Sequence, residues 1–257
     1  MTGRTKTADL TRSPENLSSQ VVTLTFFRFQ GVLGRLWAFV MMGLARFPVA
    51  RLPGLGFYKL MGAGTGEGFT PRPDTRTVVI LTTWPDLDTA QRQVTSSDIF
   101  RRYRARADEA WTLHLSPVSS RGAWSGKAPF QPAGGPPPPG PIVALTRATI
   151  RPAILLKFWE RVPDISRAIG SDPNVIFKLG VGEVPWFHQM TFSIWPDADT
   201  MARFARADGP HAKAISAVRR GDWFAEELYA RFTILAAMGS WNGTDPLAGL
   251  DQAIAAE

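Results

Sequence analysis

The chain has 257 residues, of which 44% are apolar and 20% charged, which suits one large domain or two small ones with a sizeable core. Its formal net charge of +7 favours anionic partners. No basic run is interleaved with aromatic residues, so we expect no nucleic-acid partner. The absence of cysteine excludes disulfides, thiolate nucleophiles, iron–sulfur clusters and thiolate-ligated haem.

The first half of the chain predicts the order strand, helix, strand, strand, helix, strand. Residues 1–20 are polar and lack the apolar segment of a secretory signal, so we expect a disordered N-terminal tail there. A first repeat follows over residues 21–126. Its strands are expected over 21–29, 56–61, 77–83 and 111–117, its helices over 34–50 and after Asp86, and a glycine-rich loop over 62–68.

The second half predicts the same order of elements after a linker. Residues 127–141 contain a run of glycines and prolines, which is typical of an extended linker. A second repeat is expected over 142–243, and residues 244–257 form a short C-terminal tail. Its strands are expected over 142–150, 174–179, 186–194 and 231–238, with helical regions over 153–169 and 199–228. The longest apolar stretch, residues 36–45, is too short to span a bilayer.

Two motifs show that the halves are copies of one another. The hexapeptide that starts Trp84-Pro85-Asp86 returns at Trp195-Pro196-Asp197, and the Gly-x-Trp-x-Gly pattern of residues 122–126 returns at 239–243. The spacings, 111 and 117 residues, are nearly equal. The chain is therefore a tandem duplication of a unit of about 105 residues.

The order of elements predicts an α+β fold. A βαββαβ unit is the ferredoxin-like arrangement, in which both helices cover one face of an antiparallel sheet. The other face is bare and apolar, and pairing two bare faces closes the sheets into a barrel within one chain. The many Trp and Phe residues suit a barrel interior that holds a bulky apolar ligand, or alternatively ordinary core packing.

Most of the remaining motifs predict structural roles. Asp86 and Asp197 follow a strand and a proline, where an aspartate caps the next helix. The Gly-x-Trp-x-Gly pair is also expected to be structural because both copies have it. The glycine string at 62–68 lacks the Lys-Ser/Thr ending of a phosphate loop and does not lead into a helix. No carboxylate pair stands out as catalytic.

The three histidines are the residues that separate the two copies. His114 has Arg231 as its counterpart, which favours an exposed position at the rim of the barrel. His188 lies on a strand of the second repeat and is a candidate to line the barrel interior and touch a ligand. Its assignment as a pocket residue remains open against a structural role.

His211 is the candidate metal ligand. Pro210 suits the first position of a restarted helix, which places His211 in the first turn. There the helix dipole disfavours protonation and leaves the neutral imidazole that a metal needs. A satisfied core histidine is the alternative. No second ligand lies at chelating spacing, and haem needs only one protein ligand.

The segment 100–106 contains four arginines, which predicts a cationic helix face. Such a face is either simply solvated, or it docks an acidic electron carrier or anionic lipid.

Several motifs resemble the spheroidene monooxygenase family of purple photosynthetic bacteria. They are Arg35-Leu36-Trp37-Ala38-Phe39, residues 55–62, the string Gly64-Thr65-Gly66-Glu67-Gly68-Phe69-Thr70-Pro71 and Trp84-Pro85-Asp86. The similarity covers roughly residues 21–243, and the glycine string is its most specific part.

The resemblance implies a haem-dependent, iron-containing oxidoreductase that takes part in carotenoid biosynthesis. Such an enzyme would use O2 and reduced ferredoxin to introduce a keto group at C-2 of spheroidene-type acyclic carotenoids, by two hydroxylations and loss of water. It implies His211 as the proximal haem ligand, with His188 or an arginine on the distal side or near the propionates.

Two other functions remain open at this point: a cofactor-free monooxygenase or isomerase on the same barrel, and a non-catalytic haem- or carotenoid-binding protein. We expect a cytoplasmic location with peripheral contact to the inner or photosynthetic membrane, since the implied substrate dissolves in lipid. The oligomeric state does not follow from the sequence.

Overall fold

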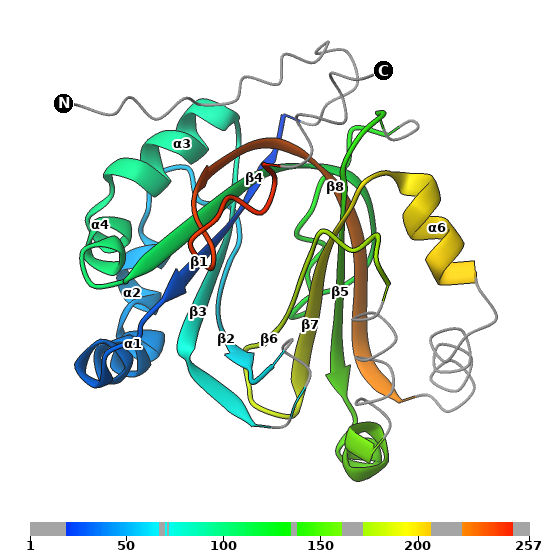
Figure 1. Ribbon diagram of the computed structural model, residues 1–257, viewed down its shortest axis with the longest axis horizontal. Helices are drawn as coiled ribbons and strands as arrows, with labels where there is room; N and C mark the ends of the chain where they lie inside the picture. The colour runs from blue at the N-terminus through cyan, green and yellow to red at the C-terminus, as the bar shows by residue number, and fades with distance from the viewer. Residues whose placement is uncertain are drawn as a thin grey trace.

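The computed structural model describes residues 19–66, 70, 72–134, 138–160, 172–206 and 223–248. Within these residues eight antiparallel strands form a closed barrel in the order β1-β3-β2-β6-β7-β5-β8-β4 (Figure 1). The strands are β1 (Val21–Arg28), β2 (Tyr58–Gly64), β3 (Pro73–Trp84), β4 (Glu109–Gly122), β5 (Ile142–Ile150), β6 (Phe177–Gly182), β7 (His188–Trp195) and β8 (Phe224–Gly239).

The barrel consists of two copies of one four-stranded sheet. The first half has the order β4-β1-β3-β2 and the second β8-β5-β7-β6, which is the ferredoxin-like order in both. A long β4–β8 ladder and a short β2–β6 contact join the halves. Closure pairs the edge strands of each half with the other, so the predicted intrachain α+β barrel is confirmed.

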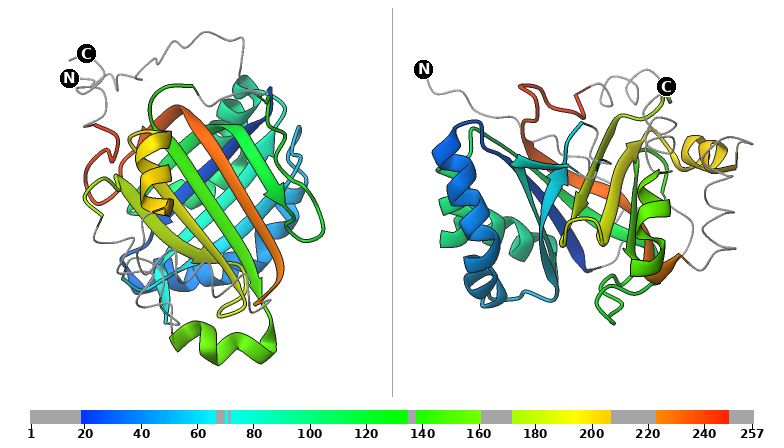
Figure 2. Two further views of the ribbon diagram at one scale, coloured as in Figure 1. Left: turned by 90° about the vertical axis from the view of Figure 1, so that its right-hand side faces the viewer. Right: turned by 90° about the horizontal axis from the view of Figure 1, so that it is seen from below.

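Four helices cover the outer face of the first half: α1 (Val32–Leu44), α2 (Arg46–Ala50), α3 (Leu87–Ser96) and α4 (Asp98–Arg104) (Figures 1 and 2). The single helix expected over 34–50 is divided at Ala45. Pro48 explains the division, because it has no N–H to donate to the carbonyl of Leu44 and so α1 ends there. None of the described helices is long and apolar enough to cross a membrane.

The second half carries fewer described helical residues. They are η2 (Pro152–Ile154), the helical residues 155–160 and α6 (Ala198–Arg206). The helical region expected over 199–228 was wrong at its end, because β8 already begins at Phe224. That strand pairs with β5 as far as Phe224 opposite Ile150, and these ladder bonds override local preference. Residues 161–171 and 207–222 lie outside the described part.

The predicted helix caps are confirmed in both halves. The Asp86 carboxylate accepts a hydrogen bond from Thr89 N at 2.7 Å, and the Asp197 carboxylate accepts one from Thr200 N at 2.6 Å. These backbone hydrogen bonds lower the pKa of both carboxyl groups. The repeated Trp-Pro-Asp corner is therefore a helix start.

Each Gly-x-Trp-x-Gly loop binds a glutamate of the opposite half. After β4, the N–H groups of Ser125 and Gly126 donate to Glu226 on β8 at 2.9 and 2.7 Å. After β8, those of Asn242 and Gly243 donate to Glu109 on β4 at 2.9 and 2.7 Å.

The glycines that open these loops are required by their backbone conformation. Gly122 and Gly239 have φ of 98° and 93°, and a Cβ there would lie 2.1 and 2.0 Å from a carbonyl oxygen of the partner strand. The loops are structural, as predicted, and they hold the halves together.

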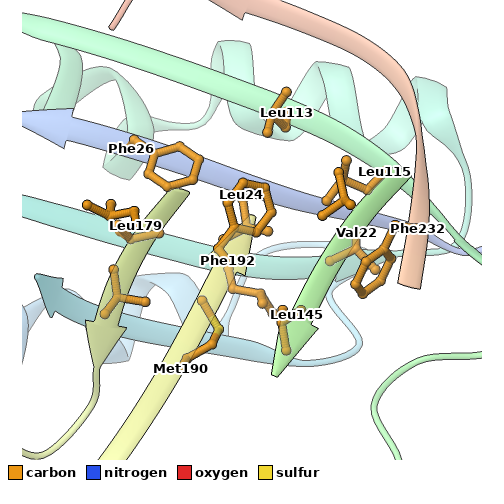
Figure 3. Close-up of a cluster of buried hydrophobic side chains, with 14 of the residues drawn as sticks. Val22, Leu24, Phe26, Leu113, Leu115, Leu145, Leu179, Met190, Phe192 and Phe232 are labelled. Atoms are coloured by element: carbon orange, nitrogen blue, oxygen red, sulfur yellow. The ribbon is translucent and has the colours of Figure 1, made fainter. Parts of the chain in front are cut away.

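Side chains fill the interior of the barrel. Figure 3 shows apolar residues of both halves pointing toward one another, and the aromatic rings of Phe26, Trp111 and Phe177 have centroids 4.8 to 5.7 Å apart. Phe130, from the segment predicted as a linker, adds its ring against Phe232. The aromatic residues therefore pack as core, and the idea that they line a ligand chamber inside the barrel was wrong.

Candidate functional site

The outer faces of the two halves carry different side chains at equivalent positions. Val21 pairs with Trp84 and Ile142 with Trp195, so the two copies can be aligned through their strand registers. In the first half a row across the sheet consists of Leu60, Ile80, Thr25 and Thr112. All four are at most 3% exposed, because α1–α4 cover this face and bury a large apolar cluster against it.

The equivalent row in the second half has less apolar bulk. It consists of Gly180, Thr191, Thr146 and Tyr229, of which Gly180 is buried, the two threonines are half-buried and Tyr229 is 39% exposed. Only small apolar clusters lie at the two ends of this face, around Trp195 and around Trp223. Between them the described residues leave a shallow surface of small side chains.

Two cations flank this surface. The neighbouring row across the sheet runs Lys178, Ser193, Ala144, Arg231, so a positive side chain stands at either end. The row spans three strand spacings, about 14 Å, which is comparable to the width of a porphyrin. We name the two rows together the open face of the second half, after their mostly small side chains: residues 144, 146, 178, 180, 191, 193, 229 and 231, of which Tyr229 and Arg231 are exposed and the others buried or half-buried.

His114 lies at the position equivalent to Arg231, on the covered side of the barrel. Its expected exposure at a rim was wrong: the side chain is 1% exposed, because the helices that pack on the first half cover it. Burial lowers the pKa of His114 to about 4, against the opposing effect of the Ala236 backbone, with which neither ring nitrogen makes a hydrogen bond of good geometry. Arg231 is exposed because the second half lacks that cover among the described residues.

A second difference between the halves lies inside the barrel. Arg147 occupies the place on β5 that Phe26 occupies on β1, and its side chain is 2% exposed. Its guanidinium forms an ion pair with Glu226 and lies 3.9 Å from Glu183. The barrel therefore has an aromatic end around Phe26 and a charged end around Arg147.

Further contacts complete the charged end. Lys59 Nζ lies 2.6 Å from Glu183 Oε2, and the indole N–H of Trp124 donates to Glu183 Oε1. Burial alone would raise the pKa of Glu226, but the N–H donors of Gly126 and Ser125 together with Arg147 hold that pKa below its ordinary value. Three strands, β2, β5 and β8, and the loops after β4 and β6 contribute to this cluster, in which Arg147 Nε has no hydrogen-bond partner.

His188 faces this charged end. Met190, Phe192 and Ile194 point into the barrel, and the two-residue period places His188 on the same side of β7. Its Nδ1 lies 4.0 Å from Glu183 and has no hydrogen-bond partner. Burial lowers the pKa of His188, Glu183 opposes that change, and Arg147 and Lys59 add to it. The imidazole is thus neutral at pH 7 and sits beside the ion pairs.

An apolar groove of about 780 Å³ lies outside the barrel. It runs between α1 and the neighbouring ends of β2, β3 and β6. Phe39 and Val40 form one wall, and Trp159 and Trp186 form another. Glu183 also reaches this groove, so the charged end of the barrel lies next to it.

Comparison with known proteins identifies relatives along most of the chain. A protein named spheroidene monooxygenase from Rhodobacter capsulatus is 50% identical over 231 residues, covering 89% of this chain and 95% of its own. One of the same name from Cereibacter sphaeroides is 49% identical, covering 89% and 71%, and one from Rubrivivax gelatinosus is 33% identical, covering 81% and 80%. This chain belongs to the spheroidene monooxygenase family.

Solved structures agree with the fold of this spheroidene monooxygenase family member. An aldoxime dehydratase in complex with butyraldoxime superposes with a TM-score of 0.61 at 11% identity, covering 94% of this chain and 87% of that one. A second aldoxime dehydratase structure gives the same score with coverages of 93% and 89%. No protein-family profile matches the chain.

The metal ligand that we predicted, His211, lies outside the described residues. Among the described residues no three histidine, cysteine, aspartate or glutamate side chains gather to hold a metal ion. A haem instead needs one protein ligand and room for a flat ring. The open face fits such a group in shape, through its small side chains, and in charge, through Lys178 and Arg231 at its ends.

Sequence analysis missed the charged cluster and the open face. The charged cluster was indicated by Arg147, which replaces Phe26 when β1 and β5 are aligned with an offset of 121 residues. The signal for the second was the replacement of Leu60 and Ile80 by Gly180 and Thr191.

Proposed function

We propose that the chain is a haem-dependent carotenoid monooxygenase that introduces a keto group at C-2 of spheroidene-type acyclic carotenoids. Reduced ferredoxin supplies the electrons in this proposal. Membership of the spheroidene monooxygenase family supports the substrate class and the use of O2. The single observation that supports a large flat cofactor is the open face of the second half, where Gly180 and Thr191 replace Leu60 and Ile80 of the first half.

In this proposal the haem would lie on the open face of the second half. Haem would supply the activation of dioxygen, and His211 would hold its iron, since a cysteine is absent from the chain. Lys178 and Arg231 would bind its carboxylates, which charge-assisted hydrogen bonds favour. Gly180, Thr146 and Thr191 leave the room that the plane of the ring needs.

The overall reaction balances without further reagents. Each hydroxylation of the C-2 methylene consumes one O2, two electrons and two protons, and it releases one water. The second hydroxylation gives a geminal diol, which loses water to form the ketone. The carotenoid is a long hydrocarbon that dissolves in lipid, so this reaction requires the protein to meet a membrane at least transiently.

The position of the cationic helix α4 bears on where ferredoxin, the proposed electron donor, docks. In α4 the rings of Phe100 and Tyr103 are buried against the sheet, and Arg101 pairs with Asp98. This helix lies on the opposite side of the barrel from α6 and the second half (Figure 1). Docking of the ferredoxin is therefore better supported near Lys178 and Arg231 than at α4.

The absorption spectrum of haem-loaded protein tests the cofactor and its ligand. His211→Ala should abolish or shift the Soret band and change the ferrous–CO spectrum, because it removes the proposed axial nitrogen. His188→Ala is the matched control, since that imidazole faces the inside of the barrel, and it should leave the Soret band in place. An unchanged spectrum in His211→Ala would contradict the assignment.

Two outcomes would replace the proposal by another function. Colourless purified protein that oxidises carotenoid despite iron chelation would be a cofactor-free monooxygenase. Protein that holds haem or carotenoid without turnover, when O2 and reduced ferredoxin are supplied, would be a binding protein.

A further inference from the structure

The helix pair α1–α2 has an exposed apolar surface that the barrel does not use. Twelve large apolar side chains are exposed among the described residues, and seven of them belong to residues 32–47. They are Val32, Leu33, Leu36, Phe39, Val40, Leu44 and Phe47. Leu33 is 83% exposed and Phe39 is 72% exposed. Contiguous apolar surfaces of this kind mark interaction sites.

The charge of this segment selects the kind of partner. Residues 31–51 contain three arginines, at 35, 46 and 51, and no acidic residue. Arg46 lies at the groove beside the exposed apolar side chains, with its Nε donating to Met42 O. An apolar helix face with only positive charges around it is typical of segments that lie in the interface of anionic bilayers.

The opposite wall of the groove extends this surface. Val184 and Trp186, in the turn between β6 and β7, are 43% and 49% exposed, and this turn lies at the same end of the molecule as α1 (Figure 1). Trp186 also lines the groove, as does Trp159, whose indole N–H donates to Trp186 O at 3.3 Å. Tryptophan is enriched where proteins meet the headgroup region of a membrane.

We propose that α1–α2 and the β6–β7 turn dock on an anionic lipid membrane, with the groove between them opening into the lipid. The exposed residues of α1 enter the boundary between headgroups and acyl chains, and Arg46 and Arg51 bind lipid phosphates. If the proposed carotenoid oxidation holds, the groove is also the path by which the substrate leaves the membrane. The docking itself does not depend on that reaction.

Flotation with lipid vesicles tests the docking. The full-length chain should float with vesicles of phosphatidylcholine and phosphatidylglycerol, and less with phosphatidylcholine alone. Leu33→Glu with Phe39→Glu should reduce the bound fraction at least about tenfold, because both side chains are exposed and charge opposes insertion. Arg46→Gln with Arg51→Gln should weaken binding to the anionic vesicles by about fivefold for each arginine.

Met238→Glu is the matched control, since Met238 is 41% exposed on β8, and it should float like the original chain. Circular dichroism of each variant checks the fold. The proposal is overturned if the original chain stays in solution with both vesicle types, or if Leu33→Glu with Phe39→Glu floats equally well. It is also overturned if that variant dissociates a dimer measured by light scattering without lipid, since the surface then belongs to a second copy.

Activity assays separate this proposal from the proposed function. Docking with no turnover on any carotenoid would leave the membrane surface intact and contradict only the reaction. Turnover that persists on detergent-solubilised carotenoid but fails on vesicle-embedded carotenoid in Leu33→Glu with Phe39→Glu would support both.

Discussion

The two halves share strand order, helix caps and Gly-x-Trp-x-Gly loops. They differ at three places: the outer face of the sheet, the barrel interior and the exposed surface of the helices. The outer face of the first half is packed with apolar side chains under α1–α4, while that of the second half has small ones. Inside the barrel, Phe26 contacts aromatic rings, whereas Arg147, at the equivalent position of the second half, contacts carboxylates. Among the described residues, most of the exposed large apolar side chains lie on α1 and α2 of the first half. Features that both copies keep are structural, and the differences mark the candidate sites.

The largest effect is expected from breaking the charged end. Arg147→Ala should destabilise the protein by about 3–5 kcal/mol, because it leaves Glu226 without its buried cation and leaves Glu183 with Lys59 alone. Arg28, over the Trp241 ring at the other end, is more exposed, so Arg28→Ala should cost about 1 kcal/mol or less. Chemical denaturation of both variants measures the difference. Equal losses of unfolding free energy in the two variants would show that the charged end and the aromatic end contribute equally to stability.

The next effect concerns His114 and its exposed counterpart Arg231. Because the folded-state pKa of His114 is about 4 and its ordinary value is 6.5, its contribution to stability is fully present above pH 6.5. It is lost as pH falls from 6.5 to 4, and it amounts to about 3 kcal/mol. His114→Leu should flatten the stability curve over that window, as measured by denaturation at several pH values.

Arg231→Leu is the control for this window, since arginine does not titrate there, and its curve should keep the original slope. A slope unchanged by His114→Leu would mean that other groups determine the acid sensitivity.

The smallest effect sharpens the comparison of the outer faces. Ala148→Phe with Thr191→Ile gives the second half the residues that the first half has at Phe27 and Ile80, and Ala148 lies beside Thr146 on the same side of β5. These side chains should fill the open face and reduce haem bound per chain at least about tenfold, as read from the Soret band. Ala128→Phe, at an exposed position between the halves, should bind haem normally. Full occupancy in the double variant would place the haem elsewhere.

Much of the fold was predictable because the duplication repeats the sequence motifs, so that each kind of helix start and strand is indicated twice. The Trp-Pro-Asp corners indicated both helix starts, and the strands had clear β-rich runs. The start of β8 was not predictable, since Glu226 and Glu227 gain their place in a strand from β5 and from the loop after β4. Local sequence carries no record of such distant partners.

The candidate site was harder to predict from the sequence, because its residues also meet through contacts between distant segments. The side chain of His114 is buried by helices that are distant from it in the sequence, whereas its residue type alone favoured exposure. Lys59 and Glu183 are 124 residues apart and meet only because β2 and β6 close the barrel. His211 stays a prediction, outside the described residues.

The reciprocal binding of Glu109 and Glu226 has a consequence for the origin of the molecule. A lone half-length ancestor would satisfy both contacts with one loop and one glutamate by forming a symmetric homodimer. Fusion of its gene with a duplicate would then lift the requirement that both subunits mutate together. From that moment one copy was free to carry Arg147 and small side chains on its outer face, while the other was free to carry the exposed apolar side chains of α1.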